Sequence, residues 1–532
     1  MSLTVVDRPT IFNQPVPIVR QDRTVWYLAI AATITSIAAF VYFYAKGTTL
    51  AYIDSISHME IARHVISGPS TGFGQLGGVW LPLPHILMLP FVWNNTLYYS
   101  GFAGSLTSMV SYVVCSVFLY RIVFDLTGKQ LPALVGALIF MTNPNILYMQ
   151  STPMTELLLF ACMAGMVYYV QRWIRTDEYR YIKRAGLAAL LGTLSRYEAW
   201  VLLGVLTLII LGVAIRKGYS RSTAIATTLA FLSRGGLGIV GWLIWNQLIF
   251  GNMMYFQNGP YAKPSLWLTG NDPAIGNWLV AIKTYWYAMA DDLKVFVIVI
   301  LVIGLMAMLV KRRLASETLP ALSLVVFIPF FVMALETGQR PLHVMQINGD
   351  LYNTRFGLLI ILPASIMGGY LFWVLPTVVK HTKVVLASVA GTGLVCLAIV
   401  AMLNLSSIMS YMDPHSAPSQ PGSYMPDEFS VSAFLRSHYT SGLILMQSFG
   451  NEILPFDGHV SLSNVIYEGS NKAKLWQSVL TNPLKYRVVW IVMRVVAGNP
   501  DLVYKHLHSS SELSSYRLVY QDVAYKIYER KQ

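Results

Sequence analysis

The chain has 532 residues, of which 55% are hydrophobic and only 12% are charged. Ordinary soluble domains contain about 25% charged residues, so this composition excludes a soluble globular protein. The net charge of +13 would suit a nucleic-acid-binding protein, but excess Lys and Arg in a membrane protein usually lie in cytoplasmic loops. We therefore expect a protein that crosses the bilayer many times and has no nucleic-acid partner.

Apolar runs separated by polar turns predict an α-helical polytopic membrane protein. Residues 1–24 are expected to form a cytoplasmic N-terminal tail, and the run that follows is too long for a cleaved signal peptide. About eleven runs approach the length of roughly 20 residues that a spanning helix needs, although 157–169 and 185–194 are short. These runs are 24–45, 98–118, 131–147, 157–169, 185–194, 200–214, 223–250, 295–310, 319–335, 356–379 and 384–403.

Basic residues predict the orientation of these helices. With the N-terminus in the cytoplasm, the short inner loops hold clusters such as Arg216 and Lys217. They carry roughly twice as many positive charges as the longer outer loops, as the positive-inside rule requires. The expected location is a plasma or inner membrane, with all residues after 404 on the outer side.

The composition divides the chain into further parts. Residues 25–404 form the expected membrane domain, which includes a long first outer loop at 46–97. A linker containing prolines follows at 405–426, and strand-like runs within 427–532 predict a small extracytoplasmic α/β domain. We expect this domain to recognise a partner molecule of the membrane domain; the alternative is that it stabilises the long outer loops.

The first outer loop contains several titratable residues between apolar segments, and such long loops are usually functional. Asp54 begins a stretch with helical spacing, where it is either a catalytic carboxylate or an N-cap. His58, Glu60 and His85 either hold the loop together or bind a divalent metal. Their spacing matches no known ligand motif, so the metal dependence stays open.

Other charged residues lie at the expected outer edge of the membrane. Glu156 falls in the first turn of a helix, where the helix dipole favours an anion, so it is either a cap or a site residue. Arg196 and Glu198 stand between two apolar runs, where each charge costs roughly 2.5–3.5 kcal/mol; they therefore form a structural ion pair or line a wet cavity. Arg355 lies at the start of the tenth apolar run. Its side chain either binds a ligand or extends to the membrane surface as a snorkelling anchor.

Lys263 lies in a long expected outer loop at 251–292, among aromatic residues that are typical of membrane interfaces. All these charged residues fall on one side of the membrane. A transporter would place its binding groups near the midplane, between matching repeats, and the sequence shows no such repeat. An outward-facing site is the better interpretation.

Several short motifs resemble those of membrane-embedded GT-C glycosyltransferases, in particular the group related to protein O-mannosyltransferases and lipid A aminoarabinose transferases. The resemblance extends over roughly residues 25–400 and includes the arrangement of many spans followed by an outer domain. The order and common sidedness of the motifs are more specific than any one of them. The motifs are Tyr52-Ile-Asp54, Ile61-Ala-Arg63, Trp80-Leu-Pro-Leu-Pro-His85, Pro153-Met-Thr-Glu156, Ser195-Arg-Tyr-Glu198, Trp245-Asn-Gln-Leu-Ile-Phe-Gly-Asn252 and Asn353-Thr-Arg355.

The resemblance implies transfer of a sugar from a polyprenyl- or dolichyl-phosphate carrier to a protein, lipid or glycan acceptor at the outer face. It assigns the catalytic role in the first loop to Asp54. Many relatives have two adjacent acidic residues at this point, whereas Ser55 follows Asp54 here. The second carboxylate is therefore Glu60, Glu156 or neither.

The expected chemistry suits these residue types. An acceptor hydroxyl needs a general base, for which Asp54 is the candidate, with Glu156 as a further catalytic carboxylate. The departing lipid phosphate needs cations, and a single displacement would invert the anomeric carbon. Candidate phosphate ligands are Arg355, Arg196 and Lys263; expected supporting residues are Glu198, His58, Glu60 and His85. The alternative functions are a multi-span transporter or flippase of lipid-linked or small solutes, and a scaffold or sensor.

Overall fold

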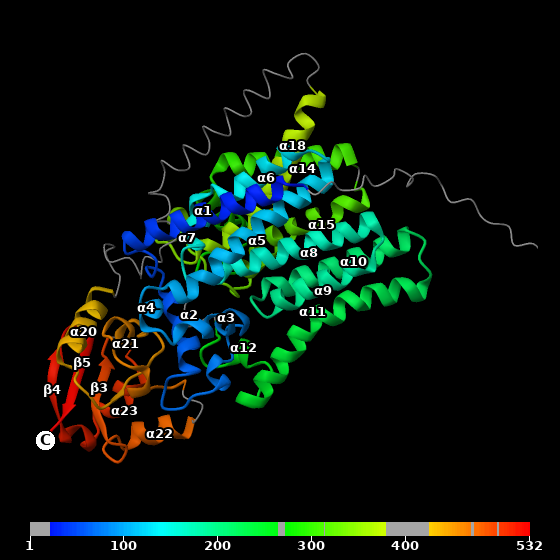
Figure 1. Cartoon of the computed structure of the whole chain (residues 1–532). Helices are drawn as coiled ribbons and strands as arrows, with labels where there is room; N and C mark the ends of the chain where they lie inside the picture. Colours follow the sequence, from blue (N-terminus) through cyan, green and yellow to red (C-terminus); the bar gives the residue numbers. More distant parts are fainter. Residues whose placement is uncertain are drawn as a thin grey trace, which may run out of the picture.

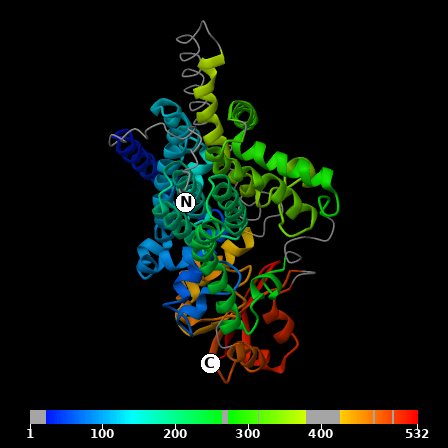
Figure 2. The same ribbon diagram turned by 90° about the vertical axis from the view of Figure 1, so that its right-hand side faces the viewer.

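The computed structural model describes residues 22–263, 272–312, 314–378, 425–469, 473–496 and 500–531. A bundle of helices makes up most of the molecule, and a smaller unit that contains a β-sheet lies at one end of it (Figure 1). Figure 2 shows the sheet unit at the opposite end of the molecule from the C-terminal part of α18. The fold is therefore mainly helical, as predicted, with a small sheet near the C-terminus.

Among the described residues, eight helical segments are long and apolar enough to cross a membrane. The first, α1 (Thr24–Ala45), has the predicted bounds. The others are α5 (Phe102–Thr127), α8 (Glu156–Thr176), α10 (Glu198–Arg216), α11 (Arg221–Phe250), α14 (Val295–Arg312), Ser316–Glu336 and Thr354–Leu375. Ser316–Glu336 consists of η4 (Ser316–Thr318), α15 (Leu319–Leu322), η5 (Ser323–Val326) and α16 (Phe327–Glu336), and the last span consists of η6 (Thr354–Ile360) and most of α18 (Ile361–Val378).

The remaining predicted spans account for the difference from about eleven. The run at 131–147 becomes two short helices, α6 (Gln130–Met141) and α7 (Pro144–Met149), because Pro144 starts a new helix that Asn143 caps. The run at 185–194 lies within α9 (Tyr179–Thr193), which packs between α8 and α11. The run at 384–403 and nearly all of the linker at 405–426 lie outside the described residues.

The helices within residues 251–292 were not predicted. The segment 251–292, expected to be a loop, contains α12 (Tyr255–Asn258) and most of α13 (Trp278–Leu293). α13 packs against α14, α16 and η6, and its buried residues Ala281, Tyr285 and Ala288 follow helical spacing. α13 was not predicted because it is short and because charged residues interrupt its apolar sequence.

The first outer loop is also largely helical. It contains α2 (Ile53–His64), η2 (Phe73–Leu76), α3 (Leu83–Val92) and α4 (Asn95–Tyr99). α2 packs against α3 and α5, so the loop rests on the end of the bundle. The helical spacing expected for the stretch after Asp54 is therefore present.

The C-terminal unit is a five-stranded mixed sheet in the order β2-β1-β3-β5-β4. β1 pairs in parallel with β2 and β3, whereas β5 pairs antiparallel with β3 and β4. The strands are β1 (Leu443–Leu445), β2 (Val465–Ile466), β3 (Val488–Arg494), β4 (Tyr516–Gln521) and β5 (Tyr525–Arg530); the helices are α20 (Met425–His438), α21 (Ile453–Asp457), α22 (Ala473–Thr481) and α23 (Leu502–Leu507), with short 3-10 turns η8 (Leu462–Asn464) and η9 (Ser511–Ser515).

One apolar core joins the first outer loop to the sheet unit. Ile56 and Met59 of α2 belong to the same buried cluster as Val431 of α20 and Ile527 of β5. α2 packs against α21, and Tyr98 and Tyr99 of α4 contact the ring of Phe456 in α21 (Figure 1). This shared core favours the interpretation that the sheet unit stabilises the outer loop.

Candidate active site

Five charged residues from four separate parts of the chain meet where the first outer loop rests on the bundle. Asp54 is the second residue of α2, and Arg355 is the second residue of η6. Glu156 and Glu198 are the first residues of α8 and α10, and Arg196 precedes α10 by two residues. We call this group the ionic network: Asp54, Glu156, Arg196, Glu198 and Arg355.

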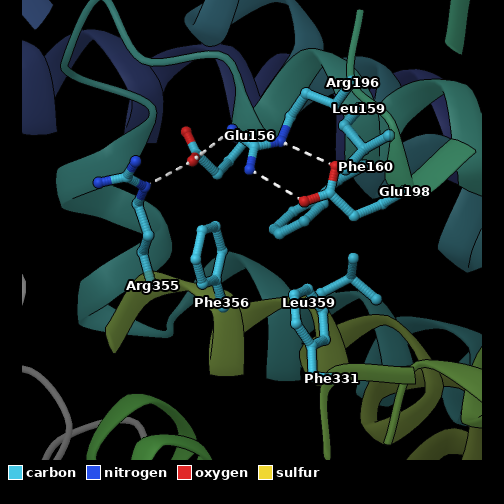
Figure 3. Close-up of a pocket in the computed structure, with 9 residues that line it drawn as sticks. All are labelled: Glu156, Leu159, Phe160, Arg196, Glu198, Phe331, Arg355, Phe356 and Leu359. Carbon is cyan, nitrogen blue, oxygen red and sulfur yellow. Dashed lines mark hydrogen bonds and ion pairs between the residues drawn. The ribbon is translucent and has the colours of Figure 1, made fainter. Parts of the chain in front are cut away.

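Acidic and basic side chains alternate along this network. Arg355 Nη2 donates to Asp54 Oδ2 at 2.7 Å, and its Nε lies 2.9 Å from Glu156 Oε1. Arg196 Nη1 donates to the same Glu156 oxygen at 2.8 Å. Its Nη2 and Nε donate to the two oxygens of Glu198 at 3.1 and 3.3 Å, a bidentate contact. Glu156 therefore links the two guanidinium groups (Figure 3).

Burial differs along the network. The Glu156 and Glu198 side chains are only 3% and 2% exposed, and that of Arg355 is 7% exposed. Asp54 is 25% exposed, so it lies at the open end. Removing one partner of a buried ion pair typically costs about 3–5 kcal/mol of stability. The network therefore holds four segments of the chain in fixed positions relative to one another.

The structure decides between several alternatives left open by the sequence. The N-cap position is occupied by Tyr52 in α2 and by Thr155 in α8, so Asp54 and Glu156 are first-turn residues and neither is the N-cap. The side chain of Arg355 is buried within the network, which contradicts the snorkelling alternative. The ion pair between Arg196 and Glu198 is present, but it is part of a larger group.

A small pocket adjoins the buried end of the network. Four network residues form its polar wall, namely Glu156, Arg196, Glu198 and Arg355, and the rest of the wall is apolar, formed by Leu159, Phe160, Phe331, Phe356 and Leu359 (Figure 3). The empty volume of the pocket is about 190 Å³, which is smaller than the roughly 300–1,000 Å³ of typical ligand sites.

Aromatic rings cover the guanidinium groups. Arg355 lies 4.5 Å from the centre of the Tyr52 ring. Three arginines surround the Phe356 ring, with Arg355 at 5.5 Å and both Arg196 and Arg340 at 5.9 Å from its centre. Such cation–π contacts stabilise a desolvated guanidinium.

The two predicted supporting histidines contact each other beside the network. His58 Nδ1 lies 2.9 Å from His85 Nε2, and the His58 ring packs on Trp80 with 4.3 Å between ring centres. Burial, assisted by His85, Arg196 and Arg355, lowers the pKa of His58 well below its usual value. The pair is therefore neutral. Within the described ranges, no three His, Cys, Asp or Glu side chains are placed to hold a metal ion.

Two predicted residues lie away from the network. Glu60 is buried, but it faces the sheet unit, where burial and then Glu452 raise its pKa well above the usual value. Lys263 is exposed, and neighbouring Tyr261 packs on Phe449 of the sheet unit at 4.8 Å. Of the carboxylates considered as partners for Asp54, only Glu156 belongs to the network.

The sequence analysis missed Arg340, which follows α16 and lies near the network. Its guanidinium is 6.0 Å from the centre of the Tyr197 ring, in addition to its contact with Phe356. The only available signal was a basic residue shortly after an apolar run at the expected outer edge.

Known proteins resemble the chain in sequence and in fold. Residues 96–251 match the family described as dolichyl-phosphate-mannose-protein mannosyltransferase. The match includes Glu156, Arg196 and Glu198 but ends before Arg355 and begins after Asp54. No curated protein matches the chain in sequence.

Two crystal structures of ArnT from Cupriavidus metallidurans share the fold. The structure bound to undecaprenyl phosphate has a TM-score of 0.56 and 10% identity, and the match covers 96% of this chain and 98% of ArnT. The apo structure has a TM-score of 0.51 and 12% identity, with coverage of 92% and 97%. The resemblance to GT-C membrane glycosyltransferases inferred from the motifs is thus confirmed, by sequence over residues 96–251 and by fold over nearly the whole chain.

Proposed function

We propose that the protein is a glycosyltransferase that moves a sugar from a polyprenyl- or dolichyl-phosphate carrier to an acceptor hydroxyl. The acceptor is a protein, a lipid or a glycan. The observation that carries this proposal is the ionic network, which places a partly exposed carboxylate, Asp54, beside the buried guanidinium of Arg355. The fold shared with ArnT, which was crystallised with undecaprenyl phosphate, supports the class of donor.

In this proposal Asp54 is the general base. As the acceptor oxygen bonds to the anomeric carbon, its proton passes to the Asp54 carboxylate. The bond between that carbon and the phosphate oxygen breaks, and its electron pair leaves with the carrier phosphate. A single displacement inverts the anomeric configuration.

Arg355 is the proposed ligand of the leaving phosphate. Its buried Nη1 has no hydrogen-bond partner among the described atoms, so one N–H is available to a phosphate oxygen. Glu156 is the second carboxylate of the site and holds Arg355 and Arg196 in place. Arg196, already bonded to Glu156 and Glu198, contributes positive charge to the phosphate, and exposed Lys263 contributes at most during approach.

We further propose that the site faces the outer side of a plasma or inner membrane. The N-terminus is then cytoplasmic, and the chain divides into a membrane domain at 25–404 and an extracytoplasmic domain at 427–532. An accessibility tag at Lys217 should report the cytoplasm, and a tag after residue 532 should report the outside. A cytoplasmic C-terminal tag would reject this orientation.

Purified protein in lipid vesicles with a polyprenyl-phosphate sugar donor tests the activity. Wild type should release polyprenyl phosphate in step with glycosylated acceptor, whereas Asp54→Asn should release neither. Movement of the intact donor across the bilayer without cleavage would instead establish the transporter or flippase alternative.

A further inference from the structure

Three guanidinium groups surround one phenyl ring, but they differ in their partners. Arg196 and Arg355 are ion-paired within the network. Arg340 contacts the same Phe356 ring and the Tyr197 ring, yet it has no ion-pair partner among the described residues. The acidic residues outside the described ranges are Asp7 and Asp413. Arg340 is therefore a cation near the site that forms no ion pair among the described residues, although it lies close enough to act electrostatically on Glu198.

The net charge of the ionic network favours an additional cation at the site. Asp54, Glu156 and Glu198 supply three negative charges, and Arg196 and Arg355 supply two positive ones, so the network as a whole carries one negative charge. A lipid-linked sugar phosphate is an anion, and in a site of low dielectric a net negative charge would repel it strongly. A further cation must offset that repulsion.

We propose that Arg340 binds the phosphate of the lipid-linked donor together with Arg355. This inference rests on the proposed function and adds a specific donor-binding residue to it. With Arg340 included, the carboxylates and guanidinium groups balance, and the phosphate adds a charge to a neutral site. The planar fork of a guanidinium suits a phosphate better than an ammonium does.

The backbone and the side chain of Arg340 are held differently, which suits a ligand-binding residue. The Arg340 N–H donates to the Ala334 carbonyl at 3.3 Å, so the end of α16 fixes the backbone. The guanidinium is half-buried and rests on two rings. It therefore lies beside Phe356, whose ring lines the pocket.

Binding of undecaprenyl phosphate, measured without any turnover, tests the proposal. Wild type, Arg340→Gln, Arg340→Lys and the control Arg517→Gln are compared in detergent by calorimetry. Arg517 lies on exposed β4, where it is paired with Glu529. Arg340→Gln should lose about tenfold or more in affinity, as expected for a charge-assisted contact. Arg340→Lys should fall between this variant and wild type, and Arg517→Gln should equal wild type.

Each outcome has a separate meaning. Equal affinity of wild type and a stable Arg340→Gln would overturn the role of Arg340 and leave the proposed function intact. Failure of wild type to bind the lipid would instead count against the proposed function. If Arg340→Gln unfolds, Arg340→Lys replaces it, and unchanged affinity in that variant would then reject the proposal.

Discussion

Helix α2 carries carboxyl groups into two different environments, Asp54 at its start and Glu60 less than two turns later. In the ionic network, each carboxylate contacts a guanidinium group. At the boundary with the sheet unit, Glu60, Glu452 and Glu468 form a second group, which we call the interface carboxyls. Their electrostatic neighbours there are other acids, Glu452 for Glu60 and Glu468 for Glu452.

The two environments give the same residue type opposite properties. Burial raises the pKa of both Glu452 and Glu468 to about 7, although backbone N–H groups oppose the rise. Glu452 and Glu468 are therefore partly protonated near neutral pH, whereas Asp54 contacts the guanidinium group of Arg355. We therefore place the proposed base in the network.

The largest expected effect separates Asp54 from Glu60. Asp54→Asn keeps the shape of the side chain but removes the proposed base, so the transfer rate should fall by a factor of roughly 10²–10⁴. Glu60→Gln should transfer at nearly the wild-type rate, because Glu60 faces the sheet unit. Initial rates of transfer in vesicles are measured for both variants. Equal losses of rate would contradict the claim that Asp54 and Glu60 lie in functionally different environments.

Removing a cation from the network should destabilise the protein strongly. Arg196→Met leaves Glu198 buried without its guanidinium partner, at a cost of about 3–5 kcal/mol. A second change, Glu198→Gln, should restore part of the loss. Arg517→Met, which breaks an exposed pair with Glu529, should cost less than about 1 kcal/mol. Thermal unfolding in detergent compares them, and similar melting temperatures for both arginine variants would argue against a buried network.

The geometry of Arg355 should matter as well as its charge. Arg355→Ala should weaken binding of undecaprenyl phosphate and slow transfer by about a hundredfold, since it removes a charge-assisted contact and frees Asp54. Arg355→Lys keeps the charge but loses the fork, and we expect about a tenfold loss. If both variants match wild type in affinity, Arg355 is not a phosphate ligand.

The smallest effect concerns pH. A carboxyl whose pKa rises from 4.5 to about 7 on folding adds stability below about pH 4.5, and this contribution is lost as the pH rises through 7. The free energy of unfolding of the wild type should therefore fall between pH 5 and pH 8, and Glu452→Gln should reduce that fall by about 1–2 kcal/mol. Thermal unfolding at several pH values compares the two proteins. Glu529→Gln, on the surface of β5, is the control. An unchanged pH dependence in Glu452→Gln would show that the interface carboxyls do not titrate in this range.

Sequence patterns placed several charged residues at one expected edge of the membrane but did not indicate which of them meet. The outer-edge interpretation grouped Asp54, Glu156 and Arg355, because sidedness follows from alternating spans. Asp54 and Arg355 are 301 positions apart, and no local pattern encodes such a contact. Glu60 could not be distinguished from Glu156 as the second carboxylate, because the environment of Glu60 comes from a unit whose packing on the loop has no sequence signal.

Helices in the bundle, too, were predicted only where the sequence contains a clear apolar run. α1 was predicted to the residue, since its apolar run has clear polar ends. α13 was missed because its buried residues, such as Tyr285, alternate with Lys283 and Asp291 over a short length. Arg340 belongs to no sequence motif. Only the structure places it beside Phe356 and Tyr197, near the network.

The core shared by α2 and the sheet unit also determines when, during synthesis, the outer loop can complete its packing. Gln75 of the outer loop and Tyr467 of the sheet unit share a hydrogen bond across 392 positions, and Ile56 belongs to the same buried cluster as Ile527 of the last strand. A ribosome adds roughly 5–20 residues per second. Tens of seconds therefore pass between the synthesis of α2 and the synthesis of these partners. Throughout that interval the apolar face of α2 lacks its partners from the sheet unit. The outer loop that carries Asp54 therefore completes its core only after β5 has been made, and the order of synthesis delays this step.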